Sequence, residues 1–116
     1  MRLRQAAVAV LGAVTLLVTV PSSSSAAQGI FEYAYVAPDG TTKWAKIDDP
    51  AGGECENFPE AADPNASEPA HSPRNRTTAT ATVFTEPDCE GDWFVLKPLT
   101  GQGTEAMKMR SVNFDS

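Results

Sequence analysis

The eight residues FTEPDCEG, at positions 84–91, decide how this chain is expected to fold. The threonine-rich run 75–85 carries apolar residues at alternate positions, which is the pattern of a half-buried strand. Proline and glycine turn the chain within 87–91, and a second apolar strand follows at 93–99. The stretch therefore predicts a β-hairpin with a cysteine, Cys89, in its turn.

The N-terminal segment predicts export from the cell. Two arginines open it, and residues 6–20 form an uncharged apolar run, shorter than the roughly 20 residues of a membrane-spanning helix. A proline, a serine spacer and the small residues Ser25-Ala26-Ala27 follow, as a signal peptidase requires. We expect residues 1–27 to be a cleaved signal peptide and 28–116 to be one secreted domain.

The charge of the mature chain argues against two classes of partner. Removal of Arg2 and Arg4 leaves seven basic residues against fifteen acidic ones, a net charge near −8. Such a chain repels phosphate backbones and has no basic patch to hold it on an anionic membrane. Neither nucleic acid nor a membrane is therefore expected to be a partner.

The two cysteines, Cys55 and Cys89, both lie in the predicted secreted part. In an oxidising compartment two thiols in a small domain usually pair. A metal pair is the weaker alternative, because two cysteines and one distant histidine do not complete a zinc site without carboxylates. The expected Cys55–Cys89 disulfide would stabilise the fold by roughly 3–4 kcal/mol in the chain-entropy model.

Short strands separated by turns are expected along the whole mature chain. Phe31, Tyr33 and Tyr35 alternate along the first of them. Trp44, in the second, is expected to cover the aromatic face that they form. No segment keeps a 3.6-residue apolar period, so the fold class is all-β, a small sandwich. The expected strands are 30–36, 41–47, 54–58, 75–85, 93–99 and 110–114.

The hairpin stretch resembles the first hairpin of a βγ-crystallin Greek key. That pattern is an aromatic residue, four residues, a second aromatic residue, one residue and a glycine. Phe84 and Gly91 match it, while Cys89 occupies the second aromatic position. The pattern also has a serine some twenty residues on, a role that Ser111 fits. The resemblance covers about 75–114 and implies a Greek-key sandwich in which the serine hydroxyl ties the hairpin to the last strand.

Calcium is the cofactor that the resemblance raises first, because many microbial relatives bind it. Their motif has two Asn or Asp, two variable residues, a hydroxyl residue and a serine. Aligned on Ser111, these positions hold Ala106, Met107 and Arg110, so the motif is absent. Carboxylates do alternate through the hairpin, and hard cations favour clustered carboxylates. They are Glu86, Asp88, Glu90 and Asp92. We expect a solvated face there, and no cofactor.

Catalysis is not expected. His71 is the only histidine, and it falls in a proline-rich segment, whereas a nucleophile and its base need a third group to hold them. A pair of carboxylates could hydrolyse glycosides if the two faced each other across a cleft. A domain this small offers little room for such a cleft.

Residues 59–74 are expected to form a long exposed loop, because four prolines interrupt them and no apolar period survives. A loop on a disulfide-tied β scaffold can present a strand-like bait to a protease. The simpler interpretation is an exposed segment that the fold tolerates and that has no function of its own. Its candidate contact residues are Pro64, Asn65, Glu68, Pro69 and His71.

We therefore predict a secreted, monomeric, non-enzymatic module that acts by binding or as an extracellular structural protein. Its partner is expected to be an extracellular protein or a glycan. The first alternative is a protease inhibitor that uses loop 59–74, since the resemblance includes secreted inhibitors. The second is an antimicrobial toxin or a carboxylate-based hydrolase.

Overall fold

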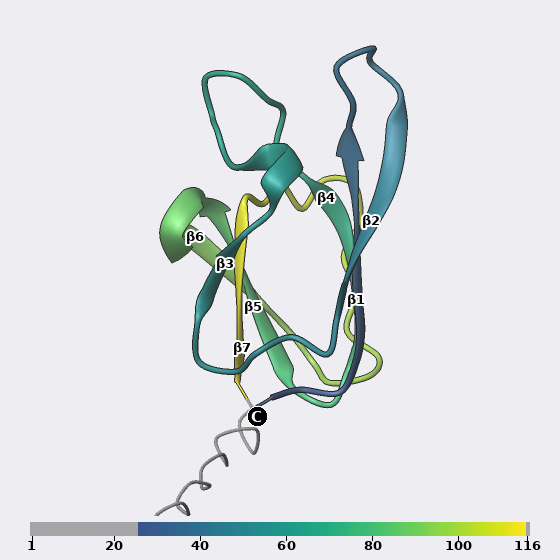
Figure 1. Ribbon diagram of the computed structural model, residues 1–116, viewed down its shortest axis with the longest axis vertical. Helices are drawn as coiled ribbons and strands as arrows, with labels where there is room; N and C mark the ends of the chain where they lie inside the picture. Colours follow the sequence, from purple (N-terminus) through teal and green to yellow (C-terminus); the bar gives the residue numbers. More distant parts are fainter. Residues whose placement is uncertain (1–25, 116) are drawn as a thin grey trace, which may run out of the picture.

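Alternating aromatic residues begin the folded part of the chain. The computed structural model describes residues 26–115, and in it the aromatic run forms β1 (Gly29–Val36). β1 pairs with β2 (Thr42–Asp48) on one side and with β4 (His71–Thr77) on the other, and the sheet is antiparallel (Figure 1). Residues 1–25 of the expected signal peptide lie outside the described part of the chain.

The second sheet contains the hairpin expected around 84–91. β5 (Thr80–Glu86) and β6 (Glu90–Leu96) are antiparallel and are joined by the short 3-10 turn η5 (Pro87–Cys89). β7 (Ser111–Asp115) pairs with β5, and β3 (Cys55–Asn57) pairs with β7, so the order is β3-β7-β5-β6. The described chain is therefore all-β, with two antiparallel sheets enclosing a common core, as the sequence predicts.

Each half of the chain contributes a segment to the sheet of the other half. The first half orders its strands β2-β1-β4, and the second half orders the equivalent strands β6-β5-β7. β3 follows the first hairpin in sequence but pairs in the second sheet. In return, Gln102 forms a bridge to Arg74 in β4, and the Asn75 amide donates a hydrogen bond to the Gly101 carbonyl at 2.8 Å. The halves are thus interlocked.

The expected disulfide is confirmed. Cys55 in β3 and Cys89 in η5 are bonded, and their Cα atoms are 5.9 Å apart. Because β3 comes from the first half of the chain and η5 from the second, the bond closes a 34-residue separation and holds the exchanged strand beside the hairpin turn.

Aromatic rings fill the space between the sheets. Phe31 and Tyr33 of β1, together with Phe58 and Phe114, are at most 2% exposed. The Phe31 ring lies 5.4 Å from Phe114 in an edge-on arrangement, and the Tyr33 ring lies 4.3 Å from Phe58. Such pairs add specific geometry to the burial of large apolar area, so this cluster is the main source of hydrophobic stabilisation.

Trp44 does not cover the aromatic face, so that expectation is wrong. It pairs with Ala34, while Tyr33 pairs with Ala45, and side chains of successive residues point to opposite faces of a sheet. Trp44 therefore lies on the outer surface, 49% exposed, with the Arg74 guanidinium 4.6 Å from its ring centroid. The register of the strand pair, which the sequence does not specify, decides its face.

The segment 75–85, expected to be one strand, is two strands separated by a turn. Asn75 is wholly buried, and its amide nitrogen donates to the carbonyls of Ala79 at 2.8 Å and Lys97 at 3.0 Å. Its side-chain oxygen accepts a 2.7 Å hydrogen bond from the Thr77 hydroxyl. Such side-chain bonds replace ladder bonds and favour a turn, which apolar alternation alone does not reveal.

The loop expected at 59–74 is shorter than predicted at both ends. It begins with a 3-10 turn, η4 (Pro59–Ala61), and β4 already starts at His71. Pro73 lies buried within β4, where a bulge interrupts the pairing with β1 and no further strand of this sheet lies beyond. Proline is tolerated at such an edge, because its missing amide hydrogen breaks no interior ladder. The irregular part is 62–70.

Candidate functional site

A pocket of about 880 Å³ lies between two projections of the chain. One is the tip of the β1–β2 hairpin, and the other is the loop 62–70; both extend from the same end of the molecule (Figure 1). We call this pocket the cleft. Its volume is within the range of about 300–1,000 Å³ that is typical of ligand sites.

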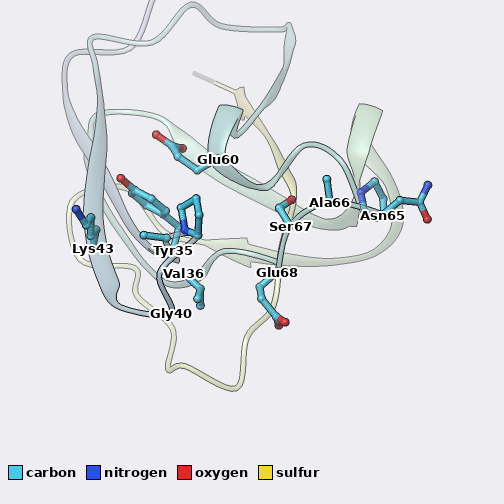
Figure 2. Close-up of a pocket in the computed structure, with 12 residues that line it drawn as sticks. Tyr35, Val36, Gly40, Lys43, Glu60, Asn65, Ala66, Ser67 and Glu68 are labelled. Atoms are coloured by element: carbon cyan, nitrogen blue, oxygen red, sulfur yellow. The ribbon is translucent and has the colours of Figure 1, made fainter.

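The two walls of the cleft differ in chemistry (Figure 2). The hairpin contributes Tyr35, Lys43 and the small apolar segment 36–38, while the loop contributes mostly polar residues. On the loop side, Ser67 and Glu68 line the pocket, and the Asn65 side chain points away from the hairpin in Figure 2.

Loop 62–70 is internally hydrogen-bonded. The amide of Asn65 donates to the Asp63 carboxylate at 2.9 Å. The amide and the hydroxyl of Ser67 both donate to the Asp63 carbonyl, at 3.0 and 2.8 Å. The segment therefore folds as a compact turn, which an Asp side chain at the first position favours, and its shape differs from the extended strand-like loop that we expected.

Arg110 anchors this loop from beneath. It is 9% exposed, and its guanidinium donates to the Ala61 carbonyl at 2.9 Å and to the Ser67 carbonyl at 3.0 Å. One acceptor lies just before the turn and the other at its end, so the Arg110 side chain fixes the turn at both ends. Hydrogen bonds from a charged donor are among the stronger ones in proteins. The loop is therefore held by the residue that immediately precedes β7 of the second sheet.

Glu60 also lines the cleft and is hydrogen-bonded to a residue of the core. The Tyr33 hydroxyl donates a 2.6 Å hydrogen bond to the Glu60 carboxylate. Burial raises the pKa of Tyr33 far above its ordinary value, and the hydrogen bond and the negative charge of Glu60 raise it further. Tyr33 therefore remains a neutral donor at any physiological pH and keeps Glu60 oriented.

The tip of the β1–β2 hairpin, which forms the other wall of the cleft, is stabilised by hydrogen bonds between residues that are close in sequence. The Asp39 carboxylate accepts hydrogen bonds from the Thr41 hydroxyl at 2.6 Å and from the Thr41 amide at 3.0 Å. These hydrogen bonds lower the pKa of Asp39. Gly40 has a φ of +87°, as the turn requires. This tip holds its own shape without a contact from a distant strand to Asp39.

Three charged side chains line the cleft, namely Lys43, Glu60 and Glu68. None of them forms an ion pair with another residue in the range 26–115, where the ion pair present is Lys46–Asp48. The cleft therefore carries one excess negative charge and offers its charges to a ligand.

The residues proposed from the sequence as a binding loop are only partly brought together here. Pro64, Asn65 and Glu68 line the cleft and are exposed, whereas Pro69 is half-buried beside it. His71 does not line the cleft. It is half-buried in β4, and its Nδ1 lies 2.8 Å from the hydroxyl of the adjacent Ser72.

The hairpin residues of the resemblance do meet in space. The Ser111 hydroxyl donates to the Glu86 carbonyl at 2.7 Å and accepts from the Cys89 amide at 2.9 Å. Phe84 pairs directly with Ser111 across β5 and β7. Gly91 has a φ of +85°, and a β carbon built there would lie 2.4 Å from the Thr85 hydroxyl oxygen.

The four alternating carboxylates do not form a metal site. Among the described residues, no three His, Cys, Asp or Glu side chains are placed so that they could hold an ion. The Asp88 carboxylate instead accepts a 3.0 Å hydrogen bond from the Asn57 side chain. Glu86, Glu90 and Asp92 are exposed along the hairpin arms.

Sequence reasoning missed four cleft-forming residues: Tyr35, Lys43, Glu60 and Arg110. From the sequence, Arg110 stands out only as a position that breaks the calcium motif, although a lone arginine before an apolar strand is also compatible with a buried anchor. The other three carry no signal of a cleft, because Tyr35 and Lys43 meet only through the pairing of β1 with β2, and Glu60 lies in the separate turn η4.

No family model, curated protein or solved structure matches this chain. Within residues 26–115, no helix is long and apolar enough to cross a membrane.

Proposed function

We propose that this chain is a non-enzymatic extracellular protein that binds a polypeptide segment of another protein in the cleft. The observation that carries the proposal is the pair of independently supported walls around a pocket of about 880 Å³. Arg110 fixes one wall and Asp39 the other. Walls fixed before binding lose little conformational entropy when a ligand enters, which favours affinity.

The chemistry of the cleft favours a peptide with apolar and basic side chains. Tyr35 and Pro38 offer apolar surface on the hairpin wall, and aromatic residues are enriched where proteins bind one another. Glu60 and Glu68 offer carboxylates that have no ion pair within the described chain. The net charge near −8 of the mature chain attracts a basic segment at long range.

A crystallin-like Greek-key fold belongs to the same proposal. It is supported by the exchange of β3 into the second sheet, by the return bridge of Gln102, and by the two hydrogen bonds of Ser111 to the folded hairpin. On this interpretation the β1–β2 hairpin with β4 is a second copy of the motif. Both copies then have the glycine at their turn, Gly40 and Gly91.

Secretion belongs to the proposal and is supported by the disulfide, and we propose a cleavage point one residue earlier than the sequence indicates. Ala27 is 1% exposed, and its backbone nitrogen donates to the Pro50 carbonyl at 2.9 Å. Cleavage after Ala27 would remove this buried contact, whereas cleavage after Ala26 preserves it and still leaves small residues at the site. We expect the mature chain to begin at Ala27, which the intact mass of protein from culture medium will show.

The binding proposal is tested by panning a random-peptide display library on the oxidised mature domain, with a glycan array in parallel. Enrichment of peptides with basic and apolar residues is expected. Glu68→Lys should weaken the selected peptide at least tenfold, because it reverses a cleft charge. Glu105→Lys, the same reversal at an exposed residue that does not line the cleft, should leave affinity unchanged.

Three results would contradict the proposal. The first is the absence of any enriched peptide. The second is binding confined to glycans, or turnover of glycans or peptidoglycan by the domain. The third is an equal loss of affinity in Glu68→Lys and Glu105→Lys, which would mean that net charge rather than the cleft determines binding.

Protease inhibition through the loop remains the second candidate. The observation that favours it is the double anchoring by Arg110, since it presents Pro64 and Asn65 on a turn of fixed shape. If the loop is the segment that enters the active site of the protease, replacing residues 63–67 by a glycine linker should abolish inhibition of a secreted serine protease. Inhibition that survives the replacement excludes this use of the loop.

A further inference from the structure

The four edge strands of the two sheets are unequally protected. An unpaired strand edge can template the pairing of another chain, and proteins usually block it with lysines, shortness or a covering segment. β2 carries the exposed residues Lys43 and Lys46. β3 is three residues long and is tied by the disulfide. β4 is covered by the segment around Gly101–Gly103, through the Gly101 and Gly103 backbone hydrogen bonds.

β6 lacks such protection over residues 93–95, beyond the carboxylates at its start. It carries three consecutive large apolar residues, and Trp93, Phe94 and Val95 are 63%, 38% and 60% exposed. No lysine lies within it. Trp93 and Val95 lie on the outer face of the sheet, and Phe94 lies on the opposite face, beside the buried Val83. Exposed apolar side chains therefore flank this edge on both faces, and exposed apolar surface of this kind marks interaction sites in soluble proteins.

The backbone of β6 is oriented to accept a further strand. The Phe84 carbonyl accepts a hydrogen bond from the β7 side, so the backbone groups of Phe84 face β7. By alternation, those of Val83 face β6, where Val83 pairs with Phe94. The amide and carbonyl groups of Trp93 and Val95 therefore face away from the sheet, and in residues 26–115 they have no hydrogen bond outside the β5–β6 pairing.

The sequence of β6 is complementary to itself when two copies run antiparallel. A two-fold axis at Phe94 sets each Trp93 opposite Val95 of the other copy, and both residues then exchange their outward backbone hydrogen bonds. Aromatic and β-branched residues are a favourable cross-strand pair. The acidic end of each strand, with Glu90 and Asp92, lies beside the Lys97 end of the other copy. A parallel arrangement would instead set like carboxylates opposite each other.

We infer that two copies of the mature domain associate through β6, forming a continuous antiparallel sheet with its two-fold axis at Phe94. The contact is isologous, so it closes as a dimer and does not propagate. It revises the monomer expected from the sequence. One edge strand buries less area than a standard interface, so the affinity is micromolar or weaker. The cleft stays open, because none of its residues lies on β6.

Sedimentation equilibrium of the oxidised mature domain over a range of concentrations tests this inference. The dimer fraction of the wild-type protein should rise with concentration. Val95→Lys should weaken association at least tenfold, since it places a charge in the strand pair. Leu99→Lys is the matched control, because Leu99 is an equally exposed apolar residue, at 55%, outside β6, and it should associate as the wild type does.

A cross-linking variant tests the register independently of affinity. At the two-fold axis, Phe94 faces itself as a non-hydrogen-bonded pair, where Cα atoms are about 4.5 Å apart, within disulfide range. Phe94→Cys should form a covalent dimer on mild oxidation. Val95→Cys should not, because its copies are diagonal neighbours roughly 7–8 Å apart.

The inference is overturned if the wild type remains monomeric up to millimolar concentration, or if Leu99→Lys disrupts association as much as Val95→Lys. It is also overturned if Phe94→Cys and Val95→Cys cross-link equally. Circular dichroism and the thermal midpoint of each variant confirm that it is folded, and a variant that fails this control is replaced by Val95→Glu.

Discussion

The two hairpins share one strand plan but differ in what holds their tips. The β5–β6 tip is fixed by distant residues, through the Cys55–Cys89 disulfide and the two hydrogen bonds of Ser111. The β1–β2 tip is closed by Asp39 and Thr41, two residues apart. The first tip is thus built into the body of the fold, while the second stands clear of it and forms a wall of the cleft.

We infer from this difference that the β5–β6 tip contributes mainly to the stability of the fold and the β1–β2 tip mainly to binding. Long-range contacts lower the entropy of the unfolded chain or bury polar groups with partners, so their loss is costly. Local contacts in an exposed turn contribute little and leave the surface accessible. We therefore expect substitutions at the β5–β6 tip to lower stability, and those at the β1–β2 tip to alter binding with small changes in stability.

The largest effect is expected on removing the disulfide. The double substitution of Cys55 and Cys89 by serine should lower the free energy of unfolding by about 3–4 kcal/mol, since the closed loop of 34 residues is freed in the unfolded chain. Urea unfolding followed by tryptophan fluorescence measures this. A decrease of less than about 1 kcal/mol in the free energy of unfolding would mean that the β5–β6 tip does not depend on the disulfide.

The two turn glycines form a matched pair. Alanine at either position adopts a positive φ at a cost of about 1–2 kcal/mol. At Gly91 the new β carbon also crowds Thr85 and Glu86, which adds about 1–3 kcal/mol, whereas nothing lies within 4 Å of it at Gly40. Gly91→Ala should therefore lower the unfolding midpoint more than Gly40→Ala. Equal shifts would contradict the comparison.

Ser111→Ala tests the tie between the β5–β6 tip and the last strand. The substitution removes the acceptor of the Cys89 amide and the donor to the Glu86 carbonyl, so a loss of about 1–3 kcal/mol is expected. Hydrogen exchange of the Cys89 amide should accelerate in the same variant. An unchanged exchange rate would show that the disulfide alone fixes the tip.

The smallest effects are expected from two carboxylates with opposite pH dependence. Hydrogen bonds from Thr41 lower the pKa of Asp39 in the folded state, so its contribution is present above the unfolded pKa and is lost as pH falls. Burial and the neighbouring Glu54 raise the pKa of Glu56, so its contribution is fully present at low pH and is lost as pH rises.

Thermal unfolding across the carboxylate titration range distinguishes the two groups. Near neutral pH, Asp39→Asn should lower the midpoint slightly and Glu56→Gln should raise it. Both differences should shrink on acidification. A difference that persists unchanged at pH 3 would show that the carboxylate charge is not its cause.

The sequence predicts the sheets better than it predicts the cleft. The alternation at Phe31 and Tyr33 follows from strand geometry, and the pairing of Cys55 with Cys89 follows from their being the two cysteines of a small domain that is expected to be exported. The turn at Asn75 was missed because buried side-chain hydrogen bonds create it. Pro73 was assigned to a loop because the protection of a sheet edge depends on which strands are neighbours.

The cleft could not be predicted for a related reason. Tyr35, Lys43, Glu60 and Glu68 are ordinary residues at separate positions, and only the register of β1 with β2 and the anchoring by Arg110 bring them together. Their residue types indicate nothing until the strands are paired. The composition of the sequence therefore indicates the loop that forms one wall of the cleft, but it does not indicate the β1–β2 hairpin as the opposite wall.

An NMR titration shows whether the two projecting walls form the binding site. The ¹⁵N-labelled mature domain is titrated with a peptide selected from the display library, and the shifts of each backbone amide are followed. If the ligand binds between the walls, the largest shifts will be in residues 35–43 and 60–68, and those of β6 will not change. Shifts centred on β6, or spread evenly over both sheets, would contradict it.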